Sequence, residues 1–317
     1  MPTLRAALII AVTLVFAPAS IGAEISTLVL GTATPGGGFT VYGEALAETL
    51  RETDPTLDIR PRPTAGSKEN IPLLEAGQLD LALVEGTAAY EALTGIGRSP
   101  APLSVIAAMY PSPGMFAVRA DSRYRTIADL KGQRVVFGAA GSGFVLLARY
   151  VLDGLGLDLQ KDFDAVLLEK VKDAPPMVIS GEAAALWGGG IGWPGFEAIA
   201  RGPKGARFIG LEPGDISRIQ TKHTFLKTMT VAAGTYPGLD RAIATVGSWG
   251  LILARPGLPD DLAYRVARAL HRAQPALGQR LAQARETIPA NTHAASPRAE
   301  FLHPGIVRYL KELGLIP

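Results

Sequence analysis

The sequence predicts a two-lobed α/β protein with mostly parallel sheets and a hinge between the lobes. Segments that resemble buried strands alternate with segments of helical periodicity, an order typical of α/β layers. The 317 residues suggest two domains at roughly 150 residues each, and the 48% hydrophobic content can furnish their cores. Two strand-like segments, residues 111–119 (PSPGMFAVR) and 245–255 (TVGSWGLILAR), bracket a self-sufficient α/β region. We therefore expect one lobe from residues 24–111 and 255–317, and the other from residues 112–254.

The first part of the chain repeats the order strand, glycine loop, helix. Loops 35–38 (PGGG) and 65–67 (AGS) separate the expected strands from the helices that follow them, and Ser67 is a candidate N-cap. The expected elements are a strand over 26–31, a helix over 42–50, a strand over 59–63, a helix over 67–74 and a strand over 79–84.

The second part follows the same scheme. Thr126 and Asp129 have the spacing of an N-cap and its N3 partner, and Gly132 is a typical stop, which predicts a short helix between them. The remaining expected elements are a strand over 134–138, a glycine loop over 141–143, a helix over 144–152, a strand over 183–187 and a long helix over 262–281, interrupted at Pro275.

The first 23 residues are typical of a secretory signal peptide. Arg5 gives a charged start, residues 6–16 are apolar, and small residues end at Ala23; Ala19 also fits the cleavage rule. The apolar run is shorter than the roughly 18 to 20 residues of a bilayer span. We expect cleavage after Ala23 and a periplasmic mature protein with no stable membrane insertion, a retained anchor being the alternative.

Composition excludes several kinds of function. The net charge is +2 with no long run of one sign, so nucleic acid is not an expected partner. The chain has no cysteine, which removes disulfides, thiolate metal sites and thiol nucleophiles. Its four histidines lack metal-ligand spacing, and we expect neither a metal nor a cofactor. A hydrolase is disfavoured because no G-x-S-x-G elbow and no S-x-x-K pair appears.

Residues 190–195 (GIGWPG) match the dinucleotide pattern G-x-G-x-x-G. The bulky Trp193 and Pro194 inside the loop, and export to a compartment poor in nucleotides, argue against that interpretation. We expect Trp187, Gly188 and Trp193 to line a binding cleft; the alternative is that both tryptophans pack in a lobe core.

The glycine loops are candidate anion sites. A loop that opens a helix exposes backbone N–H groups with no intrahelical partner, at the positive end of the helix dipole. The loops at Gly36–Thr40, Gly66-Ser67 and Gly141-Ser142-Gly143 lie at the carboxyl ends of expected strands, where open α/β sheets bind ligands. A small carboxylate held between the lobes fits this pattern; the alternative is that the glycines only form turns and caps.

A series of segments in order along the chain resembles the TAXI family of extracytoplasmic solute-binding proteins, which serve TRAP transporters. The segments are GTATPGGG with YGEALAETL, TAGSKEN, LLEAGQLDLALVEG, MYPSPGMFAVRADS, TIADLKGQRVVFGAAGSG, AAGTYPGLD, LPDDLAYRVARAL and LHPGIVRYLKELGL. The resemblance implies a type II periplasmic-binding-protein fold of the Venus flytrap kind. It also implies a small carboxylate or amino acid ligand, often glutamate or a related dicarboxylate, passed to TRAP permease subunits driven by an ion gradient.

The chain departs from the family at the ligand loops. The family's GGTYY is replaced by Gly36-Gly37-Gly38-Phe39-Thr40, its GSGT ends here in Phe144, and Glu85 stands where relatives usually have glutamine. A carboxylate in the cleft repels an anion and attracts an ammonium group. We therefore expect an amino acid or a bulkier, partly apolar carboxylate rather than a simple dicarboxylate.

The expected function is solute capture without catalysis. The alternatives are a binding protein of the same fold for an ABC-type importer of sulfonate-like or aromatic solutes, and, in another class, an exported hydrolase. The expected ligand residues are Gly37, Gly38, Phe39, Thr40, Gly66, Ser67, Glu85, Tyr110, Gly141, Ser142, Gly143, Trp187 and Gly188.

Overall fold

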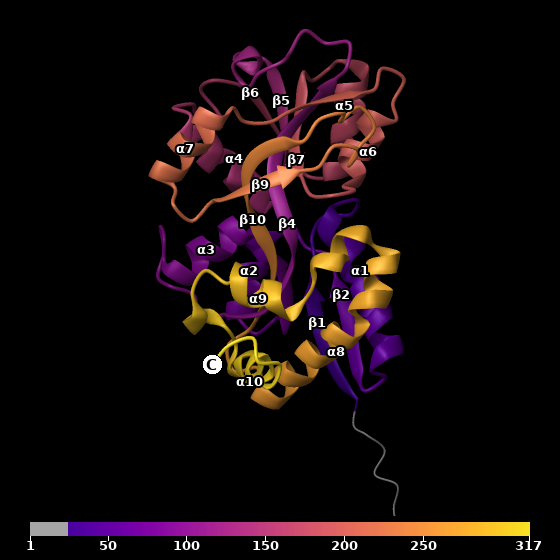
Figure 1. Cartoon of the computed structure of the whole chain (residues 1–317), viewed down its shortest axis with the longest axis vertical. Coiled ribbons are helices and arrows are strands. Elements are labelled where there is room, and N and C mark those ends of the chain that lie inside the picture. Colours follow the sequence, from indigo (N-terminus) through magenta and orange to yellow (C-terminus); the bar gives the residue numbers. More distant parts are fainter. Residues whose placement is uncertain (1–24) are drawn as a thin grey trace, which may run out of the picture.

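The computed structural model describes residues 25–317; the predicted signal peptide and its cleavage site lie outside the described residues. Figure 1 shows two halves stacked along the long axis, each with a sheet flanked by helices. Strands β4 (Ser104–Arg119) and β10 (Ile243–Ala254) run from one half into the other. The predicted α/β architecture with mostly parallel sheets is confirmed: outside these two crossing strands, all pairings are parallel.

The lower half contains a sheet in the order β2-β1-β3-β10. β1 (Ser26–Gly31) pairs in parallel with β2 (Leu57–Arg62) and β3 (Leu81–Val84), and β10 lies antiparallel to β3. The helices of this half are α1 (Gly38–Thr53), α2 (Ser67–Glu75), α3 (Gly86–Thr94), α8 (Asp260–Arg280), α9 (Pro289–Ala295) and α10 (Pro304–Glu312), with the short 3-10 helices η3 (Ala282–Glu286) and η4 (Ala299–Phe301).

The upper half contains the parallel strands β6, β5 and β7, next to β4. Its strands are β5 (Arg134–Ala139), β6 (Asp164–Leu168), β7 (Ala185–Gly189) and β8 (Ala206–Ile209), with β9 (Lys227–Val231) paired to β10. Its helices are α4 (Gly143–Gly154), α5 (Ala174–Ser180), α6 (Pro194–Ala200) and α7 (Pro213–Lys222), with 3-10 turns η1 (Ala128–Leu130) and η2 (Val171–Asp173).

The strand β4 changes partners where it passes between the halves. Up to Pro113 it pairs with β10, and from Gly114 it pairs with β7. One buried apolar cluster draws on residues 28–110 and 251–310, whereas two others draw only on residues 115–246. These separate cores support the proposed lobes, residues 24–111 with 255–317 (lobe 1) and residues 112–254 (lobe 2).

Three local predictions need correction. The helix α8 is not interrupted at Pro275, because buried Ala273 and Leu277 hold both sides of the proline against the core. Gly66, with φ 111°, occupies the N-cap position of α2, and Ser67 is the first helical residue. The short helix after Thr126 is a 3-10 turn, although Thr126 and Asp129 exchange the predicted hydrogen bonds.

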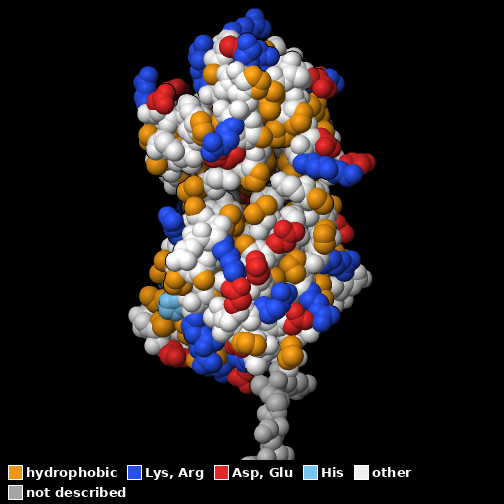
Figure 2. All heavy atoms as spheres, turned by 90° about the vertical axis from the view of Figure 1, so that its right-hand side faces the viewer, with side chains coloured by type: hydrophobic (Ala, Val, Ile, Leu, Met, Phe, Trp, Pro, Cys, Tyr) orange, Lys and Arg blue, Asp and Glu red, His pale blue; other side chains and the backbone are white. Residues whose placement is uncertain are grey.

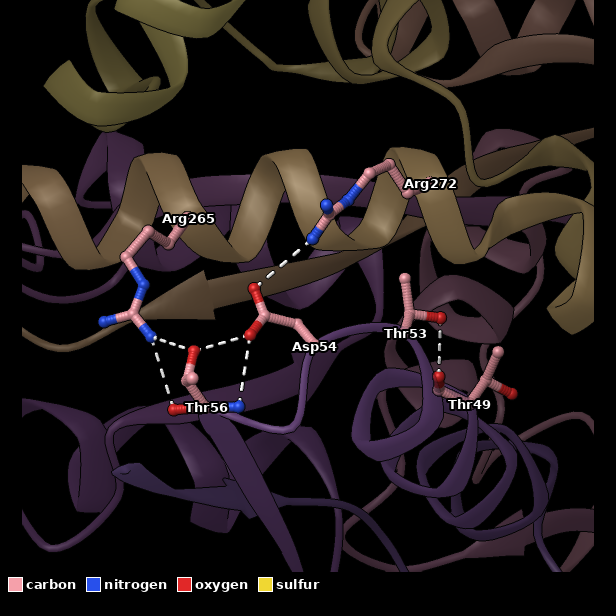
Figure 3. Close-up of polar contacts among 6 residues, drawn as sticks. All are labelled: Thr49, Thr53, Asp54, Thr56, Arg265 and Arg272. Carbon is pink, nitrogen blue, oxygen red and sulfur yellow. Dashed lines mark hydrogen bonds and ion pairs between the residues drawn. The ribbon is translucent and has the colours of Figure 1, made fainter. Parts of the chain in front are cut away.

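The turn between α1 and β2 fastens α8 to lobe 1 (Figure 3). Asp54 accepts hydrogen bonds from Thr56 and pairs with Arg272 at 3.4 Å, while Arg265 donates to the Thr56 hydroxyl at 2.7 Å. Burial opposes ionisation of Asp54, but the Thr56 hydrogen bonds and the charges of Arg265 and Arg272 outweigh it and hold the pKa of this carboxyl below its usual value. The contact matters for the site because α8 leads into η3.

We expect Asp54→Asn to lower the free energy of unfolding by about 1 kcal/mol near neutral pH, the typical value of a lost hydrogen-bond set. Because the folded pKa is lowered, the carboxylate stabilises the fold above its unfolded pKa of about 3.9, and this is lost as pH falls through the folded pKa. Urea unfolding of both proteins should therefore show a difference at neutral pH that disappears in acid. Asp240→Asn, at an exposed position with no side-chain hydrogen bond or ion pair among the described residues, is the control; an equal effect there would contradict the prediction.

Candidate functional site

The predicted glycine loops of the two lobes meet around one cavity of about 80 Å³. One water molecule needs roughly 10–15 Å³, so the space holds several waters or a small solute. On the face drawn in Figure 2, the groove between the halves is bordered mainly by uncharged side chains, whereas Lys and Arg intersperse with Asp and Glu elsewhere. All but two of the predicted ligand residues line the cavity: Gly37, Gly38, Phe39, Gly66, Ser67, Glu85, Tyr110, Ser142, Gly143, Trp187 and Gly188.

The two exceptions contact protein instead. The Thr40 hydroxyl donates to the carbonyls of Ala33 and Thr34, which closes the first glycine loop on itself. Gly141 packs on the backbone of Ala65 in the other lobe, and its carbonyl accepts from Lys68 N at 3.2 Å. Both residues therefore shape the site from outside its lining.

The lobes are in direct contact, so this is a closed form. A Cβ atom on Gly141 would lie 2.4 Å from the carbonyl oxygen of Ala65, which only glycine avoids. Away from the cavity, the Tyr150 hydroxyl of α4 donates to Glu91 of α3 at 2.7 Å. Tyr90 and Phe225 stack across the same junction with centroids 4.2 Å apart.

Each of the two serine hydroxyls accepts a hydrogen bond from a backbone N–H group. Ser67 Oγ accepts from the N–H of Glu85 at 3.0 Å, and Ser142 Oγ accepts from the N–H of Phe144 at 3.2 Å, capping α4. A hydroxyl that accepts one hydrogen bond still has its own proton to donate. Beside them, Gly38 and Gly143 begin α1 and α4, so helix N-terminal N–H groups open onto the cavity.

Glu85 is buried at 1% exposure, at the N-terminus of α3. Its carboxylate accepts from Thr87 N at 2.9 Å, from the Thr87 hydroxyl at 3.2 Å and from the Ser248 hydroxyl of β10. Burial raises the pKa of Glu85 to about 7, although the hydrogen bonds from Ser248, Thr87 and Ala88 oppose the rise. The glutamate therefore ties lobe 1 to a crossing strand, at a place where burial opposes its negative charge.

Aromatic side chains form the rest of the wall. Trp187 lies both in the lobe 2 core and on the cavity wall, so the two alternatives considered for its side chain hold together. It is 2% exposed, and its Nε1 donates to the carbonyl of Phe144 at 2.9 Å. Trp193 is half-buried, and its ring covers Gly188 and Gly195. Of the three glycines of the G-x-G-x-x-G segment, Gly195 is thus the one that accommodates this indole ring.

Gln283 is a cavity residue that sequence reasoning missed. It is 6% exposed, comes from η3 at the end of α8, and lines the cavity together with Tyr110. No motif surrounds it in the sequence, and only the return of the C-terminal helices to lobe 1 brings it to the cavity. Ala33, Thr34, Phe137 and Val171 were also missed; they add mainly apolar or backbone surface.

Residues 25–317 lack the marks of two other classes of protein, metal-binding and membrane-spanning. No group of three or more His, Cys, Asp or Glu side chains there is arranged to hold a metal ion. No helix in the same range is long and apolar enough to cross a membrane.

The fold and the interlobe cavity define a class: two α/β lobes joined by crossing strands, as in periplasmic solute-binding proteins. The aliphatic sulphonate binding protein SsuA from Escherichia coli aligns with TM-score 0.50 at 19% identity, over 90% of this chain and 78% of that one. A TctC solute binding protein from Polaromonas aligns with TM-score 0.51 at 16% identity, over 92% and 100%. A Bordetella bronchiseptica RB50 protein aligns with TM-score 0.54 at 18% identity, over 92% and 89%.

The chain belongs to the NMT1-like family, which it matches over residues 30–314. At such identities the solved structures establish the fold. This membership does not by itself single out the TAXI family that the sequence resembles.

Proposed function

We propose that this protein is an exported solute-binding protein that captures a small carboxylate or amino acid between its lobes. The observation that carries the proposal is the cavity enclosed by glycine loops of both lobes, where backbone N–H groups and two serine hydroxyls surround a space for a small solute. Closure around a ligand removes water and strengthens these hydrogen bonds together. In the TAXI interpretation the ligand passes to TRAP permease subunits, and residues 1–23 are the export signal, cleaved after Ala23.

Catalysis is not part of the proposal. The described residues that line the cavity include no histidine or lysine, and the chain has no cysteine, so the serines have no neighbouring base other than Glu85. The Glu85 carboxylate accepts its hydrogen bonds from Thr87 and Ser248 rather than from a serine of the lining.

A second candidate is a binding protein for an ABC-type importer of sulfonate-like or aromatic solutes. The aromatic wall of the cavity favours it, and the fold is shared with SsuA, which binds sulphonates. A thermal-shift screen of the chain from residue 24 against amino acids, oxo acids, dicarboxylates, aromatic acids and sulfonates separates the two, because a ligand of the folded state raises the midpoint. Stoichiometric uptake without turnover is expected; turnover would contradict both candidates.

Removing either serine hydroxyl is expected to weaken binding of the ligand found in that screen. Ser67→Ala and Ser142→Ala should each cost about 1 to 3 kcal/mol, the effect of a lost buried hydrogen-bond partner. Titration calorimetry measures the affinities, and Ser217→Ala, at an exposed position of α7, is the matched control. Wild-type affinity in both cavity variants would remove these serines from the site.

A further inference from the structure

The charged side chains on the cavity wall are of one sign, negative. Glu85 is the only acidic side chain among the described residues that line the cavity, and none of those residues is Arg, Lys or His. Glu85 also forms no ion pair within residues 25–317. A buried carboxylate without a cation is costly, because desolvation is not offset by an opposite charge.

The groups that hold Glu85 are all neutral. Three donors from Thr87 and Ser248 occupy three of the roughly four acceptor positions of a carboxylate. Two neighbouring elements also face Glu85 with neutral residues: Ser67 of α2 and Gly143 of α4. A Cβ atom added to Gly143 would lie 3.1 Å from Glu85 Oε2. The side chain is thus fixed in place at the lobe junction by neutral donors, with no counter-charge among the described residues.

The surrounding wall suits a cation as well. Phe39, Tyr110, Phe144 and Trp193 line the same small cavity, and aromatic faces attract ammonium groups where water is excluded. A simple dianion would instead place like charge next to Glu85, and it would bind only with a proton on that carboxyl.

We propose that the ligand carries an ammonium group that pairs with Glu85, so that Glu85 selects amino acids over the corresponding carboxylic acids. This inference rests on the proposed solute-binding function. The ligand carboxylate then lies toward the N–H groups at Gly38 and Gly143, and its apolar part lies against the aromatic wall. Glu85 is accordingly a specificity residue. The variant Glu85→Gln keeps the shape of the side chain and removes its charge.

The experiment compares matched ligand pairs that differ only in the amino group. The pairs are phenylalanine with phenylpropanoate, leucine with isocaproate and glutamate with glutarate, each titrated into the wild-type chain from residue 24. We expect the amino acid of the binding pair to bind at least about 10-fold tighter than its partner, the ratio that a single charged hydrogen bond supplies. In Glu85→Gln we expect that ratio to fall to near unity. Glu44→Gln, at an exposed position of α1, makes the same charge change and should keep the ratio.

The outcomes separate this inference from the proposed function. If the carboxylic acid binds wild type as tightly as the amino acid, or Glu85→Gln leaves the ratio intact, the role of Glu85 is overturned while solute binding stands. If no member of any pair, and nothing in the wider screen, shifts the midpoint of wild type, the proposed function itself is overturned. The wild-type comparison is decisive even if Glu85→Gln does not fold.

Discussion

Gly141→Val is expected to lower ligand affinity by about 100-fold, equivalent to roughly 2.7 kcal/mol. Gly141 does not line the cavity, so the substitution removes no ligand contact. Its new Cβ would lie 2.4 Å from the Ala65 carbonyl oxygen and 3.0 Å from the Ala65 Cβ across the lobe junction. Backbone atoms at such distances must move apart, and the lobes then stop short of the closed form. Overpacking of this kind costs about 1 to 3 kcal/mol.

The control separates closure from folding. Gly214→Ala, in α7, adds a Cβ with nothing within 4 Å and should bind as wild type does. Small-angle scattering should show a larger radius of gyration for Gly141→Val with ligand than for wild type with ligand. Urea unfolding should give the same free energy of unfolding for the two ligand-free proteins. Full affinity in Gly141→Val would mean that the contact between Gly141 and Ala65 is not required for binding.

The strands and glycine loops were predictable because their signals are local. Buried apolar runs such as Leu28–Leu30 and Leu81–Val84 form strands, and glycine follows them where the chain turns toward a helix. Because β1, β2 and β3 are parallel in lobe 1, and β5, β6 and β7 are parallel in lobe 2, the carboxyl ends of each set share one edge, which brings the loops together. This topology explains why the loop residues predicted from the sequence line the cavity.

What was missed depends on tertiary contacts. Gln283 reaches the cavity because α8, which leads into η3, packs buried residues such as Val266 and Leu277 into the lobe 1 core. Likewise, the direct packing of Gly141 on Ala65 follows from how far the lobes close, which no short motif encodes. The uninterrupted α8 shows the same effect, since packing on both sides of Pro275 overrides its local preference.

Trp187→Ala is expected to lower the free energy of unfolding by about 3 to 5 kcal/mol, the usual cost of deleting a fully buried aromatic side chain. The indole packs on Phe116 at a centroid distance of 4.8 Å, and its Nε1 satisfies the carbonyl of Phe144. The ring also lies over Gly114, where β4 changes partners, since a Cβ there would be 2.5 Å from it. Removal therefore opens a void at the junction between the crossing strand and the lobe 2 core, and it deletes the hydrogen bond from the indole to the Phe144 carbonyl.

Trp193 is the control for the structural role of Trp187. It lines the same cavity, but it is half-buried and lies in the loop before α6, in edge-to-face contact with Phe196. Trp193→Ala should cost clearly less stability than Trp187→Ala, because a partly exposed ring loses less buried surface. Its larger effect should fall on ligand affinity. Urea unfolding and calorimetry on both variants measure the two effects separately. Equal losses of stability would mean that Trp193, too, belongs to the core of lobe 2, and that the aromatic wall of the cavity is structural throughout.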